Sequence, residues 1–210
     1  MKFLLIMTIS ATTLLAHNAQ SQEIPDLKPI VAGSTDKAAN RWITITKVQK
    51  PAAATRDYIV QQSIVSIPEY AKMPGLLFKA YSFSEKADYF GGIYLWADKT
   101  SATNWFSTAW FERVKKTYNS PGEVNYYQVK SVKTLKTISE TKGSYYMALS
   151  IGKKQVHYGD GLICIFTIID ANGKSGNITL WNNETTAREY FKENPNNTEF
   201  FDTPVLLNNQ

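Results

Sequence analysis

The feature of this sequence that most constrains its fold is an internal repeat. Seven residues of one segment recur later in the chain with the same identity, in the same order and at one constant interval. The first set is Gly91, Ile93, Leu95, Trp96, Thr100, Ala102 and Phe106, and the second is Gly176, Ile178, Leu180, Trp181, Thr185, Ala187 and Phe191. A repeat of this length indicates two copies of one supersecondary unit. We therefore expect a fused pair of similar units.

The repeat also predicts matching elements around its core. Asp98 aligns with Asn183, and each follows a strand that ends in Leu-Trp. Both side chains are suited to capping the N-terminus of a helix. Upstream, Gly75 aligns with Gly161 after a gap of one residue, and each precedes an apolar segment. Each copy is predicted to contain a strand, a tight connection, a second strand, a helix and a final strand.

The amino-terminal residues predict a cleaved signal peptide. A charged start, Met1-Lys2, precedes an apolar run that ends near Leu15 and is too short to span a bilayer. Ala19-Gln20-Ser21 supplies the small residues of a cleavage site. We expect residues 1–21 to be removed, residues 22–40 to form a flexible leader, and the mature protein to be periplasmic or secreted. No later apolar run is long enough for a transmembrane helix.

Residues 41–132 are predicted to form the first repeat. Strands are expected at residues 42–46, from Gly75 through about Phe83, at 92–96 and at 124–129. One helix is expected to begin at Pro51 and end at Pro68, and a second to run from about residue 99 to residue 118. This order of elements, βαββαβ, is typical of a ferredoxin-like unit.

Residues 142–210 are predicted to form a shortened second repeat. A strand is expected near 145–151, and only about ten residues separate it from Gly161, too few for a crossover helix. Asn172-Gly173 predicts a hairpin turn, followed by a strand at 178–181, a helix at 184–193 and a last strand at 200–207. Either the second repeat has lost its first helix or its first strand comes from elsewhere in the chain, and we expect the loss of the helix.

The two hairpins are apolar on both faces. In the first, Phe78 and Ala80 alternate with Leu77 and Tyr81, and in the second, Cys164 and Phe166 alternate with Ile163 and Ile165. A sheet with helices on one face and water on the other has one polar face. The second face must therefore be covered, and the sheet of the other repeat is the obvious cover. We expect an α+β, pseudo-dimeric barrel that is closed or nearly closed, with helices outside, in a monomeric chain.

Cysteine content and charge limit the classes of partner. Cys164 is the only cysteine, so an intramolecular disulfide is excluded and stability must come from a packed core. From Phe111 to Lys154 there are nine basic and three acidic residues. This excess could attract anionic ligands or a membrane surface. Because basic and aromatic residues do not interleave there as nucleic-acid surfaces require, we expect a solvated face and no nucleic-acid partner.

Two segments carry a family resemblance. The residues from Pro74 to Lys79, PGLLFK, and from Gly91 to Ala102, GGIYLWADKTSA, resemble the YdhR-type monooxygenases of the antibiotic-biosynthesis-monooxygenase, or dimeric α+β barrel, superfamily. The resemblance is good over residues 42–129 and weaker over the second half. It implies a barrel that two identical chains usually build, so a tandem chain resembles a fused dimer. Some members of this superfamily oxidise aromatic or polyketide-like substrates with O₂ and use neither metal nor flavin, and others cleave haem. Membership of the superfamily therefore indicates the fold of a protein more than its chemistry.

The chemistry that the resemblance implies needs an apolar pocket with donors for an enolate or phenolate. Aromatic side chains and one lysine are the candidates for binding a substrate: Tyr81, Tyr94, Trp96, Trp105, Trp110 and Lys79. The candidate catalytic residues are Tyr94, Trp110 and His157. The competing interpretation is that the aromatic residues only fill the core and that the lysine reaches an edge of the sheet. One histidine and one cysteine in the mature chain do not predict a zinc site.

The resulting hypothesis is an exported barrel that binds a small hydrophobic or aromatic molecule and can oxidise it without a cofactor. Two alternatives remain open. One is a non-catalytic binding or scaffold module of the same fold. The other is a haem-binding or haem-degrading relative, which would place His157 in the pocket.

Overall fold

The computed structural model describes residues 35–37, 40–86, 88–138, 140–152, 159–193 and 195–209. The predicted signal peptide lies outside these residues, as do most of the leader and His157. None of the helices in the described ranges is long and apolar enough to cross a membrane.

The described residues form nine strands, four α-helices and one short 3₁₀ helix. The strands are β1 (Thr35–Lys37), β2 (Trp42–Gln49), β3 (Leu76–Ser84), β4 (Tyr89–Trp96), β5 (Glu123–Thr134), β6 (Lys142–Ile151), β7 (Leu162–Ile169), β8 (Ser175–Trp181) and β9 (Thr198–Asn208). The helices are α1 (Arg56–Ala71), α2 (Lys99–Trp105), α3 (Thr108–Tyr118) and α4 (Glu184–Tyr190), and the 3₁₀ helix is Pro195–Asn197.

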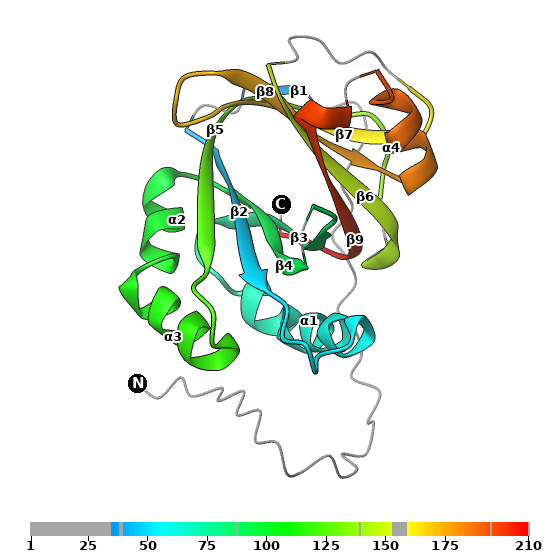
Figure 1. The fold of residues 1–210 in the computed structure, drawn as a ribbon. Coiled ribbons are helices and arrows are strands. Elements are labelled where there is room, and N and C mark those ends of the chain that lie inside the picture. Colours follow the sequence, from blue (N-terminus) through cyan, green and yellow to red (C-terminus); the bar gives the residue numbers. More distant parts are fainter. Residues whose placement is uncertain are drawn as a thin grey trace.

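The strands close into an antiparallel barrel (Figure 1). Eight of the described strands follow the order β5-β2-β4-β3-β9-β6-β8-β7, and pairing of β5 with β7 closes the ring. β1 adds to β5 at Ser131–Lys133, beyond the residues of β5 that pair with β2. The prediction of an α+β barrel with its helices outside is confirmed.

Two groups of four strands share one order. In β5-β2-β4-β3 and in β9-β6-β8-β7, the sequence positions run fourth, first, third, second. The register shifts between Leu76 and Phe78 in β3, and between Leu162 and Cys164 in β7. Gly75 and Gly161, which precede these irregularities, have φ values of 76° and 82°, a backbone region that favours glycine. The groups join where β3 pairs with β9 and β5 with β7.

The interior of the barrel is filled with apolar side chains. Alternate residues of each strand point inward, which is why the strands are apolar on both faces. The interior includes Ile43, Ile45, Phe78, Ala80, Ile93, Leu95, Met147, Cys164, Phe166, Ile178, Leu180 and Phe201. An ion pair spans the interior between β2 and β9, with Lys47 Nζ 2.7 Å from a Glu199 carboxylate oxygen.

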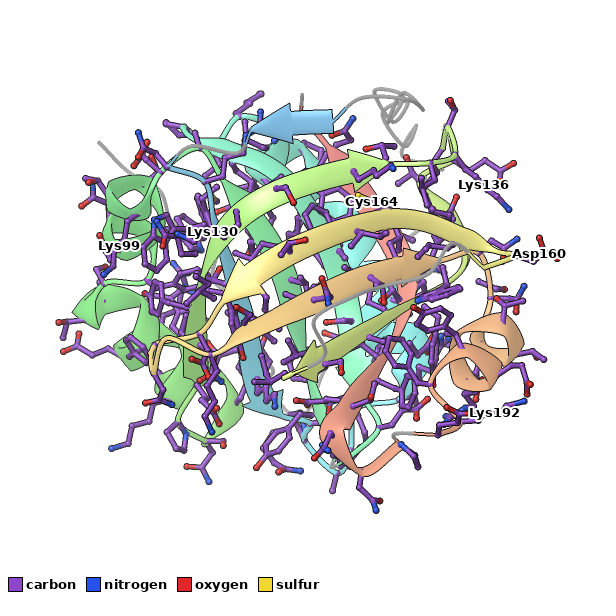
Figure 2. The ribbon with its side chains drawn as sticks, turned by 90° about the horizontal axis from the view of Figure 1, so that it is seen from above. Lys99, Lys130, Lys136, Asp160, Cys164 and Lys192 are labelled. Carbon is purple, nitrogen blue, oxygen red and sulfur yellow. The ribbon has the colours of Figure 1, made fainter. Side chains whose placement is uncertain are left out.

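The outer face of the barrel carries two further apolar layers. Helices α1, α2 and α3 cover one layer, and α1 packs on both β3 and β9. Helix α4 packs on β6 and β8 and covers the other layer. Figure 2 shows β5 and β7 crossing the face of the barrel between these groups of helices. Residues 153–158, in the connection from β6 to β7, lie outside the described residues, so the absence of a crossover helix there stays a prediction.

The structure corrects both ends of the first predicted helix. It begins at Arg56, where the Thr55 side chain accepts a hydrogen bond from the Tyr58 N–H, and not at Pro51. It also continues through Pro68 to Ala71. Proline removes one helical hydrogen bond, but Pro68 is exposed, and burial of Ile64 and Ile67 against the sheet holds the helix together.

The second predicted helix, residues 99–118, is two helices. The chain leaves helical geometry at Phe106, and Ser107 begins α3. The break turns the buried Phe106 ring against Trp110, at 5.1 Å between ring centroids, while Trp105 points toward α1. The expected helix start after Asp98 is confirmed, because Asp98 accepts a hydrogen bond from Ser101 N–H at 2.8 Å.

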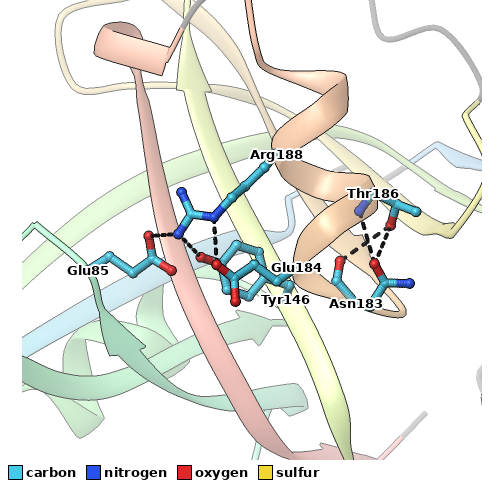
Figure 3. Close-up of polar contacts among 6 residues, drawn as sticks. All are labelled: Glu85, Tyr146, Asn183, Glu184, Thr186 and Arg188. Atoms are coloured by element: carbon cyan, nitrogen blue, oxygen red, sulfur yellow. Dashed lines mark hydrogen bonds and ion pairs between the residues drawn. The ribbon is translucent and has the colours of Figure 1, made fainter.

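Helix α4 is attached to both groups of strands through Arg188 (Figure 3). Its guanidinium donates to Glu85, in the turn after β3, and to the Tyr146 hydroxyl of β6 at 2.8 Å. Glu184, one turn earlier in the helix, accepts from Arg188 Nε at 2.6 Å. Asn183 begins α4 as the repeat predicts, accepting from Thr186 N–H at 2.9 Å.

Candidate functional site

Four of the predicted site residues lie on one outer patch of β3 and β4. Lys79 and Tyr81 of β3 and Tyr94 and Trp96 of β4 alternate with residues that fill the barrel. In the register of these strands, Lys79 is directly opposite Tyr94. Helices α1 and α2 cover this patch, so the predicted residues lie between helices and sheet, outside the barrel interior.

Lys79 is buried among aromatic rings. Its side chain is 2% exposed, and its Nζ lies 3.1 Å from the ring centroid of Tyr70, 3.8 Å from that of Tyr81 and 4.8 Å from that of Tyr94. Within the described ranges its amine has neither a hydrogen bond nor an ion pair. The lysine does not reach an edge of the sheet. We call Lys79, Tyr70, Tyr81 and Tyr94 the lysine–tyrosine cluster.

Burial changes the protonation of the lysine. Loss of water lowers the pKa of Lys79 well below its usual value, and Glu69 opposes this shift weakly. Contact with aromatic faces favours the ammonium, by about 2 kcal/mol in a dry site. Burial is the largest cause of the downward shift of this pKa, because it penalises the charged form. Desolvation therefore dominates, and the cluster favours the neutral amine.

The tyrosines keep their protons. Burial raises the pKa of Tyr70 to about 12, although a hydrogen bond with Tyr94 partly opposes the shift. Burial also raises the pKa values of Tyr81 and Tyr94 well above their usual value. The Tyr81 hydroxyl lies 2.7 Å from Ser66 Oγ of α1, which fixes the position of its ring. The cluster thus combines a neutral amine with phenol groups that can donate hydrogen bonds.

Gly92 makes the arrangement of rings possible. A Cβ atom at this position would lie 2.8 Å from a ring carbon of Tyr94. Gly92 is also the residue opposite Tyr81 in the neighbouring strand. The glycine therefore leaves the space in which the Tyr94 ring lies.

Tyr70 and Trp105 form the outer wall of the cluster. Both side chains are half-buried, and their rings meet edge to face with centroids 5.7 Å apart. The indole Nε1 of Trp105 is buried and has no hydrogen-bond partner in the described part of the chain. The Arg113 guanidinium lies 5.4 Å from the Trp105 ring. This wall adds to the cluster an N–H donor without a partner in the described residues and a guanidinium group beside the indole.

Trp96 and Trp110 pack behind the cluster. Trp96 is fully buried, stacks on Tyr94 with centroids 5.8 Å apart, and donates from Nε1 to Thr44 Oγ1 at 2.9 Å. Trp110 is buried against Phe106, and a Cβ atom at Gly122 would lie 2.7 Å from its ring. These contacts indicate that both indoles support the rings that surround Lys79.

The second group of strands provides a comparison at equivalent positions. Lys79 pairs with Tyr94 in β3 and β4, and Ile165 pairs with Thr179 at the same step of β7 and β8. Thr167 occupies the place that corresponds to Tyr81. Ile165 lies in an ordinary apolar layer. The backbone geometry therefore does not require a lysine among tyrosines, and the cluster belongs to the first group only.

Sequence analysis missed Tyr70 and Ser66. Both lie in α1, and Tyr70 follows Ile67 by three residues on the same helical stripe. That spacing could identify Tyr70, but the sequence pattern predicts that the helix ends at Pro68. His157, the third catalytic candidate, lies outside the described residues. Among the residues that are described, no group of three His, Cys, Asp or Glu side chains could hold a metal ion.

Three solved structures share this fold. A putative monooxygenase from Lactobacillus acidophilus has 12% sequence identity and a TM-score of 0.53, over 81% of this chain and 97% of its own. A putative monooxygenase from Fusobacterium nucleatum has 10% identity and a TM-score of 0.52, over 80% and 94%. An anthrone oxidase-like protein has 6% identity and a TM-score of 0.53, over 84% and 97%. These similarities concern the fold alone.

Sequence comparison gives a family match that covers three of the four strands of the first group, β3, β4 and β5. Comparison with curated proteins finds no match. Residues 51–142 match the family described as putative mono-oxygenase ydhR, and this range contains α1, α2 and every member of the lysine–tyrosine cluster. This similarity to the YdhR mono-oxygenase family is confined to residues 51–142, less than half of the 210 residues of the chain.

Proposed function

We propose that this protein binds a small hydrophobic or aromatic molecule at the lysine–tyrosine cluster and oxidises it with O₂ without a metal or flavin. One observation carries the proposal. An unpaired lysine amine is buried among three tyrosines, at a position where the second group of strands has Ile165. A buried amine and phenols with shifted pKa values are typical of sites with a chemical role.

The side chains of the cluster suit an aromatic molecule that carries an oxygen atom. The rings of Tyr70 and Trp105 offer faces and edges for stacking. Trp105 Nε1 is a buried donor without a partner in the described residues, and the phenols remain protonated. These donors would stabilise negative charge on a substrate oxygen as the substrate gives an electron to O₂. Surrounding apolar residues would strengthen these interactions by excluding water.

We also propose that the two groups of strands are copies of one unit, fused into a pseudo-dimer. The repeated residues, the shared strand order and the matching irregularities in β3 and β7 support this origin. Export to the periplasm or beyond the cell, after removal of residues 1–21, remains part of the proposal. It rests on the amino-terminal sequence alone.

The test measures ligand retention and O₂ consumption in the mature protein and in matched variants. Native mass spectrometry identifies a retained molecule, and an oxygen electrode measures its turnover. Tyr94→Phe should remove a donor and lower turnover by about 10²–10³-fold if the hydroxyl faces the developing charge. Tyr145→Phe is the control, because Tyr145 lies inside the barrel and donates to the Glu140 carbonyl. Equal turnover in the two variants would contradict the role of Tyr94.

The outcome also separates the two alternatives. A retained aromatic molecule without O₂ consumption would support a non-catalytic binding module of the same fold. A haem-binding relative would show a Soret band after addition of haem, and His157→Ala would remove that band. Because His157 lies outside the described residues, its contribution is argued from the sequence only.

A further inference from the structure

We propose that Lys79 captures carbonyl compounds: its amine condenses with an aromatic aldehyde to form an imine with release of water. The inference uses the binding site of the proposed function, and thus rests on it, but it requires no O₂. It adds a covalent activity to the lysine–tyrosine cluster. The argument depends on the surroundings of the amine, on the rings beside it and on the proton donors within reach.

The surroundings of Lys79 leave its lone pair free. Attack on a carbonyl carbon requires a neutral amine, because an ammonium group has no lone pair to donate. Lys79 Nζ is enclosed by rings and pairs with no carboxylate among the described residues. In contrast, Lys47, Lys50 and Lys192 each form an ion pair with a carboxylate. Burial, which lowers the pKa of Lys79, supports the same conclusion.

The rings that enclose the amine select the type of carbonyl compound. Tyr70 and Tyr94 lie on two sides of the lysine, and Trp105 continues the wall from Tyr70. An aromatic aldehyde can stack on these rings, whereas a short aliphatic aldehyde gains little from them. The aldehyde carbon lies next to the ring, so a ring bound at this wall brings that carbon toward the amine.

Side chains of the lysine–tyrosine cluster can donate and accept every proton that imine formation requires. The nitrogen lone pair forms the C–N bond while the C=O π electrons move to oxygen, and a proton passes from nitrogen to oxygen to give a carbinolamine. A phenol donates a proton to the leaving hydroxyl group, which departs as water, and the phenolate takes the remaining proton from nitrogen. The products are an imine and one water molecule, without oxidation or reduction. Tyr70, Tyr81 and Tyr94 are suitable donors because their raised pKa values keep them protonated.

The experiment traps the imine on the full mature chain. The protein is incubated with benzaldehyde and cyanoborohydride at pH 7 in the absence of O₂, and labelled lysines are mapped by peptide mass spectrometry. We expect Lys79 to be labelled at least tenfold faster than the exposed Lys116, and expect propionaldehyde to show no such preference. Lys79→Met should abolish this label and leave the slow labelling of other lysines unchanged. The variant is expected to fold because Ile165 occupies the equivalent position.

Two results would overturn the inference, and they differ in what they say of the proposed function. If Lys79 is labelled no faster than Lys116 while benzyl alcohol, which has no carbonyl group, still binds by calorimetry, carbonyl capture is wrong and the aromatic site remains. If neither labelling nor binding occurs, the site and the inference both fail. Tyr94→Phe gives a further measure, since loss of one proton donor should slow labelling of Lys79 without changing that of Lys116.

Discussion

At Lys79, loss of water favours the neutral amine, whereas contact with the aromatic rings favours the ammonium. The loss of water has the larger effect, and the pKa of the lysine falls. A lysine amine in an apolar layer costs free energy whether it is charged or neutral, since water no longer solvates it. The three nearby rings recover part of this cost, but Ile165 fills the equivalent place without any polar group. A residue that weakens its own layer of packing is typical of a site in which stability has been lost for function.

This cost predicts that Lys79→Met stabilises the protein. Methionine has a similar length and no polar group, so the free energy of unfolding should rise by about 1–3 kcal/mol. Urea denaturation at pH 7 measures the change. Lys116→Met, on the exposed side of α3, is the control and should have little effect. A loss of stability in Lys79→Met would mean that contact of the ammonium with the rings outweighs its desolvation.

The lowered pKa of Lys79 also predicts a dependence of stability on pH. Between this pKa and the ordinary value of about 10.4, the unfolded state holds a proton that the folded state does not. The free energy of unfolding should therefore rise with pH in this window, by at most about 1.4 kcal/mol per pH unit. Below the lowered pKa, both states are protonated and the full penalty remains.

Matched denaturation curves isolate this effect. The buried tyrosines and Cys164 have raised pKa values, so they act in the opposite direction above their unfolded values. Lys79→Met keeps all of these groups, and the difference between the two proteins reports Lys79 alone. Parallel curves for the two proteins from pH 7 to the onset of tyrosine ionisation would show that the amine is not shifted.

At the scale of elements, the break between α2 and α3 decides what each indole does. Trp105 follows α2 toward Tyr70, and Trp110 follows α3 onto Phe106 and Gly122. One continuous helix, as the sequence pattern predicted, would not give the two side chains these separate directions. The break therefore assigns Trp105 to the wall of the lysine–tyrosine cluster and Trp110 to the packing behind it.

This assignment predicts that Trp110→Ala acts on stability. Removal of a buried indole leaves a cavity and should lower the free energy of unfolding by about 3–5 kcal/mol. Trp105→Ala, at a half-buried position, should cost less stability and should weaken binding of an aromatic ligand more. Thermal melting and calorimetry on the two variants test this reversal. Loss of binding in Trp110→Ala at unchanged stability would place that residue at the ligand instead.

The limits of sequence analysis are visible in particular elements. The closed barrel could be predicted because Phe78 and Tyr81 lie on opposite faces of one strand and both need apolar cover. The end of α1 could not, because tolerance of Pro68 depends on its exposed position in the folded helix. Tyr70 could not be identified either, because it lies beyond the predicted end of the helix. The sequence therefore identified the lysine and two of its rings but not the ring nearest to its amine.

For the whole molecule, closure of the barrel predicts a monomer. Pairing of β3 with β9 and of β5 with β7 uses the strand edges at both joints between the groups. The helix α1 crosses one of these joints by packing on β3 and β9 together. A second copy of the chain is then not needed to complete the sheet. Sedimentation equilibrium should give the monomer mass, and an obligate dimer would contradict this interpretation.

The same joints predict the result of truncation after Leu135. The fragment would lack β6 to β9, so β3 would lose its neighbour β9 and β5 its neighbour β7. The inner face of the remaining strands, with Phe78 and Ile93 on it, would lie open to water. Exposed apolar patches and unpaired edges favour association, so the fragment should aggregate or form a dimer that rebuilds the barrel. Size-exclusion chromatography with light scattering distinguishes these states. A soluble monomeric fragment as stable as the full chain would instead show that the two groups of strands are independent domains.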